Sequence, residues 1–199
     1  MNRVPELHFP EPTRGEKRLL VKGMAWADYH MFGKAAVRWG GVRVSYLDGT
    51  LELMFPSFEH ELRKSRIGGL LEMYLERRQI HFYEHGSATL KKELKQAGKE
   101  PDESYCLHRQ NKIPDLAIEV AITGGGIDTL EIYRRWKIAE VWIWQRDHLK
   151  VFLLEDDAYA PKTASRWLPE LDLKLLATCV LIEDGLEARR AFLAKSGLV

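Results

Sequence analysis

Residues 116–122 read LAIEVAI, a short apolar segment that is interrupted only by Glu119. A segment that is apolar on both sides of its alternation is typical of a strand covered on both faces within a mixed sheet. Burying an unpaired carboxylate is costly, so a single acid inside such a strand requires a partner or a function. The segment therefore predicts a central strand and, at Glu119, a candidate site residue.

The segments that follow this strand alternate between helical and strand patterns. Glycines 124–126 predict a loop, and residues 127–137 predict a short helix with an apolar face. From Glu140 onward the sequence predicts two strands joined around Arg146 and Asp147. Residues 171–193 form an amphipathic helical pattern.

The segments that precede the strand contain two helical patterns with a hairpin between them. Residues 24–39 and 58–79 carry apolar side chains three or four positions apart, which is the spacing of one helix face. Residues 42–55 alternate on both sides of Asp48 and Gly49, a pair that tolerates the positive φ angles of a tight turn. Shorter strand patterns occur at residues 80–83 with 88–90, and near residues 104–107.

This order of elements predicts an α/β (α+β) fold in which helices flank a mixed β-sheet, with an N-terminal helix and β-hairpin. At 199 residues, of which 45% are hydrophobic and 30% charged, the chain has the length and composition of one globular domain. We assign this domain to residues 23–199. Residues 1–22 contain three prolines and little periodicity, so we expect an N-terminal arm that carries no chemistry.

The composition also excludes several classes of protein. No apolar run approaches the roughly 20 residues that a membrane span needs, and the N-terminus has no apolar signal core, so we expect a cytoplasmic protein. Cys106 and Cys179 are far apart, which argues against a disulfide framework or a zinc site. The formal net charge is only +1, so any contact with nucleic acid requires a local patch. Seven basic residues form either a solvated face or such a patch: Arg63, Lys64, Arg66, Lys91, Lys92, Lys95 and Lys99.

Two acids lie at or inside predicted strands. Asp102 occurs in EPDESYCL (residues 100–107), and Glu119 occurs in the central strand. A hard cation such as Mg²⁺ needs only one or two carboxylates from the protein, and such a site suits phosphodiester hydrolysis. Glu59, at the start of the long helix, is the candidate third acid. The alternatives are a turn residue at Asp102, a structural ion pair at Glu119, and a helix-dipole partner at Glu59.

Several motifs together resemble one known family. YLDGTLELMFPSFEHE (46–61), EPDESYCL, PDLAIEVAITGGGIDTLEIYRRW (114–136) and EVWIWQ (140–145) are similar to the Uma-two family, of the cyanobacterial type, over residues 26–179. The resemblance implies a restriction-endonuclease-like, PD-(D/E)XK core that cleaves DNA with Mg²⁺ or Mn²⁺. It also implies catalytic roles for Glu59, Asp102 and Glu119, with Asp102 and Glu119 binding the metal.

The resemblance further implies a catalytic lysine, which the sequence lacks at both matching positions. Ala121 stands two residues after Glu119, and Thr129 stands at the matching position of the following helix. Two hypotheses therefore stay open: a metal-dependent endonuclease, and a catalytically inactive nuclease fold that binds nucleic acid or a protein partner. A homodimer is consistent with the first hypothesis, because cleavage of both strands of a duplex needs two sites.

Overall fold

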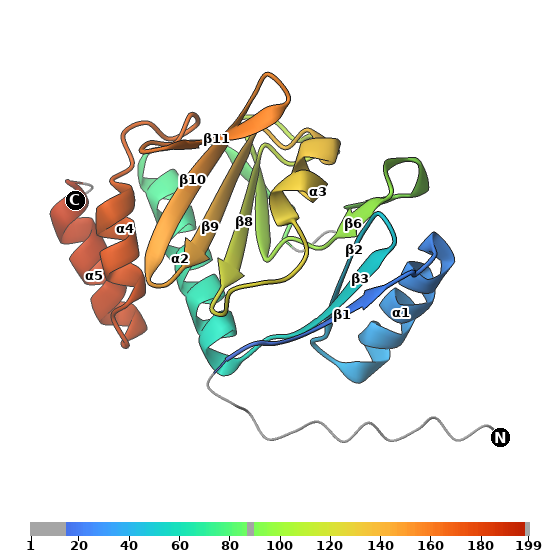
Figure 1. Ribbon diagram of the computed structural model, residues 1–199. Helices are drawn as coiled ribbons and strands as arrows, with labels where there is room; N and C mark the ends of the chain where they lie inside the picture. Colours follow the sequence, from blue (N-terminus) through green and yellow to red (C-terminus); the bar gives the residue numbers. More distant parts are fainter. Residues whose placement is uncertain (1–14, 87–89, 198–199) are drawn as a thin grey trace.

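The computed structural model describes residues 15–86 and 90–197, which form two β-sheets and five α-helices (Figure 1). The larger sheet has the strand order β11 (Ala158–Lys162), β10 (His148–Glu155), β9 (Glu140–Gln145), β8 (Leu116–Ala121), β7 (Glu103–Leu107) and β4 (Phe82–Glu84). The smaller sheet has the order β1 (Lys17–Lys22), β3 (Thr50–Phe55), β2 (Arg43–Leu47), β6 (Ala97–Lys99) and β5 (Leu90–Lys92). The expected mixed class with a sheet and flanking helices is confirmed.

Strand β8 is the central strand that the sequence predicted. It pairs antiparallel with β7 and parallel with β9, which makes the larger sheet a mixed one. Leu116, Ile118 and Val120 pack into the main core, whereas Ala117 packs with Tyr133 on the opposite face. Because side chains alternate along a strand, Glu119 lies on the face of Ala117.

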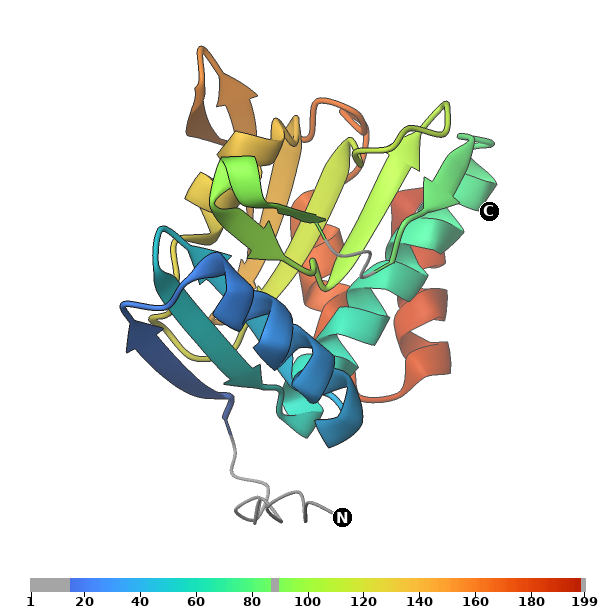
Figure 2. The ribbon, with the colours of Figure 1, turned by 90° about the vertical axis from the view of Figure 1, so that its right-hand side faces the viewer.

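Helices cover both faces of the larger sheet, as Figure 1 shows. Helices α2 (Phe58–Arg77), α4 (Leu173–Val180) and α5 (Gly185–Ser196) lie on one side. The short helix α3 (Thr129–Trp136) and the smaller sheet lie on the other. Helix α1 (Trp26–Trp39) packs across the smaller sheet (Figure 2). Its residues Trp26 and Tyr29 contact the ring of Tyr46 on β2.

The predicted C-terminal helical segment is divided into α4 and α5. Asp184 caps α5 by accepting a hydrogen bond from the Glu187 N–H. On α2, Arg63 donates to the carbonyl of Val180, and Arg66 donates to the carbonyls of residues 182–184. These two arginines satisfy carbonyl groups at the end of α4 and in the turn that follows, so neither belongs to a freely solvated basic patch.

Both predicted hairpins are present. Strands β2 and β3 pair from Arg43 to Leu47, and Asp48 and Gly49 have φ angles of 43° and 79° in the turn. Strands β9 and β10 are antiparallel, and the turn between them places Arg146 and Asp147 at φ angles of 50° and 59°.

Residues 17–22, which we expected to belong to an arm, form the edge strand β1. They pair with β3 along their whole length, from Lys17 opposite Phe55 to Lys22 opposite Thr50. Leu19 and Leu20 are both largely exposed, so the strand has no apolar face that a sequence pattern could reveal. Its position depends on backbone pairing. Residues 1–14 lie outside the described part of the chain.

Strand β11 and the 3-10 helix Glu93–Lys95 were not predicted either. The expected strand at residues 80–83 appears as β4, and residue 90 begins β5, whereas residues 88 and 89 lie outside the described range. Cys106 and Cys179 are free and buried, as expected. Among the described helices, none combines the length and the apolar character needed to cross a bilayer.

A glycine determines how β6 passes the aromatic cluster under α1. A Cβ atom added at Gly98 would lie 2.6 Å from the ring of Tyr29, a buried residue of α1. Contacts this short do not occur between real side chains, so only glycine allows β6 to lie against this ring. The next residue is Lys99, which therefore depends on this contact for its place.

Replacing this glycine should destabilise the protein. We expect Gly98→Ala to cost about 1–3 kcal/mol of unfolding free energy, because the buried Tyr29 ring must move. Gly33→Ala is the matched control: Gly33 lies in α1, and a Cβ there meets nothing within 4 Å. The control should be neutral or stabilising, since alanine favours helix. Equal urea midpoints for the two variants would contradict the packing argument.

Candidate active site

A cluster of charged side chains lies buried where the two sheets meet. Its members come from both sheets, from α2 and from the segments beside β1 and β7: Glu16, Arg18, Glu52, His60, Lys99, Asp102 and Glu119. Each of these carboxylates is hydrogen-bonded, as the cost of burying a charge demands. Four acids face three cations, so the cluster carries one negative charge in excess when every group is ionised.

Asp102 precedes β7 and is only 2% exposed. Its Oδ1 lies 3.0 Å from Nε2 of His60, and its Oδ2 accepts a 2.8 Å hydrogen bond from the Val120 N–H. Burial raises the pKa of the Asp102 carboxyl, but the hydrogen bond and charge of His60 outweigh burial, so that its pKa is lowered. Asp102 is therefore an ionised carboxylate held at the backbone of β8.

Glu119 points from β8 toward the smaller sheet. One carboxylate oxygen accepts a hydrogen bond from the Tyr133 hydroxyl of α3, and the other lies 3.1 Å from Nζ of Lys99. Burial raises the pKa of Glu119 to about 7, against the lowering effect of the Lys99 charge. The charge of Asp102 also raises the pKa of Glu119, and Asp102 is bonded to the N–H of Val120, the residue that follows Glu119 in β8.

Lys99 supplies an amine to this site from the other sheet. It is 4% exposed and ends β6, close to the acids of β8 and of the segment before β7. Burial alone lowers the pKa of Lys99, but the charges of Glu119 and Asp102 outweigh it and raise the pKa. From the sequence we expected Lys99 to belong to a basic face or a phosphate track and did not predict it as a site residue; its burial shows that it is not part of a solvated face. A strand of three residues carries too little periodicity to reveal which side chain turns inward.

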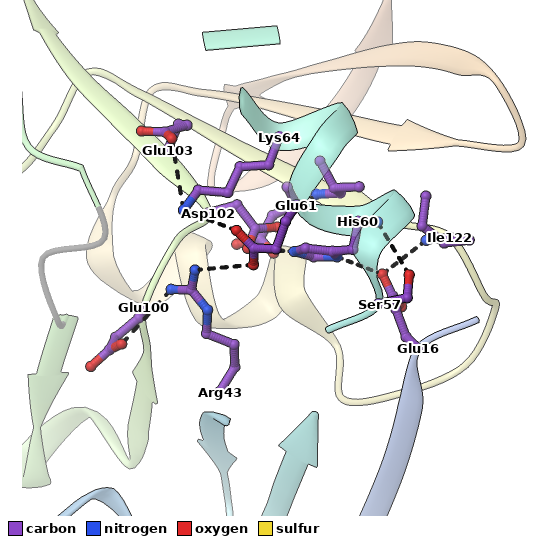
Figure 3. A network of polar contacts seen from close by, with 12 residues as sticks. Glu16, Arg43, Ser57, His60, Glu61, Lys64, Glu100, Asp102, Glu103 and Ile122 are labelled. Carbon is purple, nitrogen blue, oxygen red and sulfur yellow. Dashed lines mark hydrogen bonds and ion pairs between the residues drawn. The ribbon is translucent and has the colours of Figure 1, made fainter. Parts of the chain in front are cut away.

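His60 bridges two carboxylates, as Figure 3 shows. Its Nδ1 lies 2.7 Å from Oε1 of Glu16, and its Nε2 faces Asp102. Burial alone lowers the pKa of His60, but the hydrogen bonds to Asp102 and Glu16 outweigh burial and raise it to about 9. A ring flanked by two carboxylates must donate from both nitrogens, so His60 is an imidazolium.

Arg18 and Glu52 extend the cluster to the glycine loop after β8. Arg18 donates to Glu52 Oε1 at 2.8 Å, and the Ile127 N–H donates to Glu52 Oε2 at 2.7 Å. A Cβ at Gly126 would lie 2.5 Å from Glu52 Oε2 and 2.9 Å from the Arg18 guanidinium. The loop thus approaches the cluster closely, and Gly126, with φ of +108°, makes this approach possible.

The structure brings together two of the three predicted acids. Asp102 and Glu119 share the cluster, whereas the Glu59 side chain is 43% exposed and lies 3.4 Å from Arg63 one turn later. No contact found within the described residues joins Glu59 to Lys99 or to the two strand acids. From the first turn of α2, the residue that enters the cluster is His60.

The helical pattern itself contains the signal for His60. Ile67 belongs to the buried stripe of α2, and His60 stands seven residues before it, which is two helical turns. Neighbouring residues on a helix differ by about 100° in direction, since a turn holds about 3.6 residues. Extending the apolar stripe back to the first turn therefore selects His60 rather than Glu59.

Two cations and several acids lie around Asp102 nearer the surface (Figure 3). Arg43 is 3.9 Å from Glu61 and 4.0 Å from Glu100, and Lys64 is 3.8 Å from Glu103. These are loose contacts, beyond hydrogen-bonding distance. Ion pairs of this kind contribute little to stability, so both cations can change partner at low cost.

The carboxylates of Asp102 and Glu119 fit a hard divalent cation. Each of their four oxygens has one donor in the structure, and a carboxylate oxygen can accept about two. Mg²⁺ and Mn²⁺ accept oxygen ligands and retain several waters, so two carboxylates suffice. In the described residues, no group of three or more histidine, cysteine or acidic side chains could hold a metal ion, so the two carboxylates would be the protein's whole share of such a site.

The His60 imidazolium makes the stability of the fold depend on pH. Its pKa is about 9 when folded and about 6.5 when unfolded, so the folded protein holds the extra proton between these values. This extra proton stabilises the folded state by up to about 3 kcal/mol of unfolding free energy. The stabilisation is fully present below pH 6.5 and is lost as the pH rises to 9. We expect the melting temperature to fall by several degrees over this range.

The variant His60→Gln serves as the control for other groups that titrate in this range. It should melt lower than the wild type at pH 6.5 but show a flatter dependence up to pH 9. Parallel curves for the two proteins would mean that His60 does not hold the extra proton. Differential scanning calorimetry at a series of pH values measures both curves.

Comparison with known proteins adds one finding to this geometry. The Uma2 family, described as "Putative restriction endonuclease", matches residues 27–181. The comparison with curated proteins finds no match. The matched range contains His60, Lys99, Asp102 and Glu119, and it begins after Glu16. Since the match covers most of the chain, this protein belongs to the Uma2 family of restriction-endonuclease-like proteins.

Proposed function

We propose that this protein is a metal-dependent endonuclease that hydrolyses phosphodiester bonds in DNA. The observation that carries the proposal is the meeting of three buried charged groups: Lys99 of β6 lies 3.1 Å from Glu119 of β8, and Asp102 accepts from the N–H of Val120, the residue after Glu119. Asp102 and Glu119 are the residues that would hold Mg²⁺ or Mn²⁺. The family supports nuclease activity in general.

Each group in the site has a role in this reaction. A bound divalent cation would activate the attacking water and offset the charge that develops on the phosphate. The chain itself provides orientation: the Val120 N–H and His60 fix Asp102, and Tyr133 fixes one oxygen of Glu119. The Lys99 ammonium would donate to a phosphate oxygen and stabilise negative charge there. Lys99 would thus provide the amine that is missing at Ala121 and Thr129.

DNA would reach the site past Arg43 and Lys64. Both cations make only loose ion pairs near Asp102, so a backbone phosphate can compete for them. The neighbouring acids and the net charge of +1 keep this contact weak and dependent on salt. A homodimer would place two such sites on one duplex. A cytoplasmic location is part of the proposal, because two free thiols suit a reducing compartment.

Cleavage of supercoiled plasmid in the presence of Mg²⁺ or Mn²⁺ tests the proposal. Asp102→Asn and Glu119→Gln should each abolish nicking, because each removes a carboxylate that would hold the metal. Glu140→Gln is the matched control, since Glu140 is a fully buried carboxylate of β9 that accepts hydrogen bonds from Trp142 and Arg166. This control should cleave like the wild type. Loss of nicking in all three variants would point to a general loss of folding.

The role of Lys99 can be tested by moving its amine. Lys99→Met keeps the length of the side chain and should lower the cleavage rate by about 100-fold to 10,000-fold. Thr129 begins α3, one turn before Tyr133 and on the same helix face, so a lysine there can reach Glu119. We expect Lys99→Met/Thr129→Lys to recover part of the rate. An unchanged rate in Lys99→Met would exclude a role for this amine.

One observation favours the second hypothesis, a nuclease fold without catalysis. Asp102 and Glu119 are 2% and 7% exposed, and every oxygen of both carboxylates already has a donor from the protein. Such a closed network can hold two sheets together without any reaction. Folded wild-type protein that binds DNA but cleaves nothing with Mg²⁺ or Mn²⁺ would establish this alternative.

A further inference from the structure

Glu16 lies ahead of the range that the family matches, yet its side chain is fully buried in the charged cluster. We propose that Glu16, acting through His60, is a positioning residue that fixes the Asp102 carboxylate for metal binding. The proposal rests on the proposed function, because it assigns Asp102 to the metal. It makes Glu16, the residue just before β1, a part of the active site, where the sequence indicated only an arm.

The first step of the argument concerns His60, whose place is set by the start of α2. Ser57 caps this helix, and its hydroxyl accepts a 3.2 Å hydrogen bond from the His60 N–H. The ring is 0% exposed, and its two nitrogens lie 2.7 Å from Glu16 and 3.0 Å from Asp102. With a carboxylate at each end, the ring has one orientation that satisfies both nitrogens.

The second step concerns Asp102, which has a competing partner. The Lys99 ammonium lies 3.1 Å from Glu119, Asp102 is held at the next residue of the same strand, Val120, and the charge of Lys99 lowers the pKa of Asp102. An Asp102 carboxylate released from His60 can rotate toward this ammonium and form an ion pair, because buried charges seek the nearest partner. The His60 bond to Oδ1 and the Val120 N–H bond to Oδ2 prevent this rotation. The carboxylate thereby keeps its remaining lone pairs for a cation.

The third step concerns Glu16 itself, which is fixed from several directions (Figure 3). Its Oε1 accepts from His60 and, at 3.0 Å, from the Ile122 N–H at the end of β8. Its Oε2 accepts from Arg18 at 2.8 Å and from the Thr123 hydroxyl at 3.3 Å. Glu16 is thus anchored to β8, the strand that carries Glu119. The bridge from Glu16 through His60 therefore fixes Asp102 relative to β8, the strand that carries Glu119.

Residues that hydrogen-bond to metal-binding side chains usually affect metal affinity. Removing such a partner typically lowers metal affinity or activity by about 10-fold to 100-fold. A purely structural network behaves differently, because its loss lowers the folded fraction but leaves the affinity of folded molecules unchanged. Metal affinity, measured where every variant is folded, separates these two roles.

The experiment measures Mn²⁺ binding by electron paramagnetic resonance, well below the melting temperature of each variant. Glu16→Gln and His60→Gln should each weaken binding by about 10-fold to 100-fold. The double variant should bind no more weakly than His60→Gln alone, because Glu16 acts through His60. Glu140→Gln is the matched control: it changes a fully buried carboxylate of β9 that lies outside the cluster, and it should bind like the wild type.

A second readout uses plasmid cleavage. Glu16→Gln should lower kcat and leave KM for DNA unchanged, because Glu16 is buried away from any substrate. Wild-type affinity for Mn²⁺ in folded Glu16→Gln would overturn the proposal, and so would additive losses in the double variant. If His60→Gln does not fold, Glu16→Gln compared with Glu140→Gln decides the question alone. Failure of the wild type to bind Mn²⁺ or cleave DNA would instead refute the proposed function, and this inference with it.

Discussion

The cost of burying carboxylates governs the way in which the two sheets of this protein meet. Four acids lie in the interface, and each is held by cations or backbone N–H groups that belong to other elements. A buried charge that loses its partner costs several kcal/mol, so these elements cannot separate one at a time. The arrangement of β1, β6, β8 and the start of α2 follows from this constraint.

The same constraint also determines the charge balance of the candidate site. When every group is ionised, the four acids exceed the three cations by one, which leaves a buried negative charge. Burial raises the pKa of Glu119, and so does the charge of Asp102. A divalent cation bound by Asp102 and Glu119 would relieve this imbalance. The proposed nuclease function therefore accounts for a feature of the cluster that a structural network alone leaves unexplained.

Local periodicity was sufficient to predict the elements that build the frame. The pattern of β8, the turn at Asp48 and Gly49, and the stripe of α2 all depend on residues close in sequence, and all are present. Asp102 and Glu119 were predicted as site residues because each acid lies at or inside a predicted strand. Their roles in metal binding stay predictions.

The other members of the cluster depend on contacts over long distances in the sequence. Glu16 bonds to a backbone group 106 residues away, and no local pattern records such a contact. Lys99 owes its place to Gly98, which lets β6 pass the buried ring of Tyr29. His60 and Glu59 are adjacent residues, and their side chains differ by about 100° in direction around α2. Predicting which of them enters the cluster therefore requires the direction of the buried helix face.

The central claim is that Asp102 and Glu119 together hold one divalent cation. Electron paramagnetic resonance titration of Mn²⁺ into the wild type, Asp102→Asn and Glu119→Gln tests this claim most directly. The account predicts a single site in the wild type that is lost in each variant, while circular dichroism shows that all three proteins are folded. Equal Mn²⁺ binding by the three proteins, or no binding by the folded wild type, would contradict it.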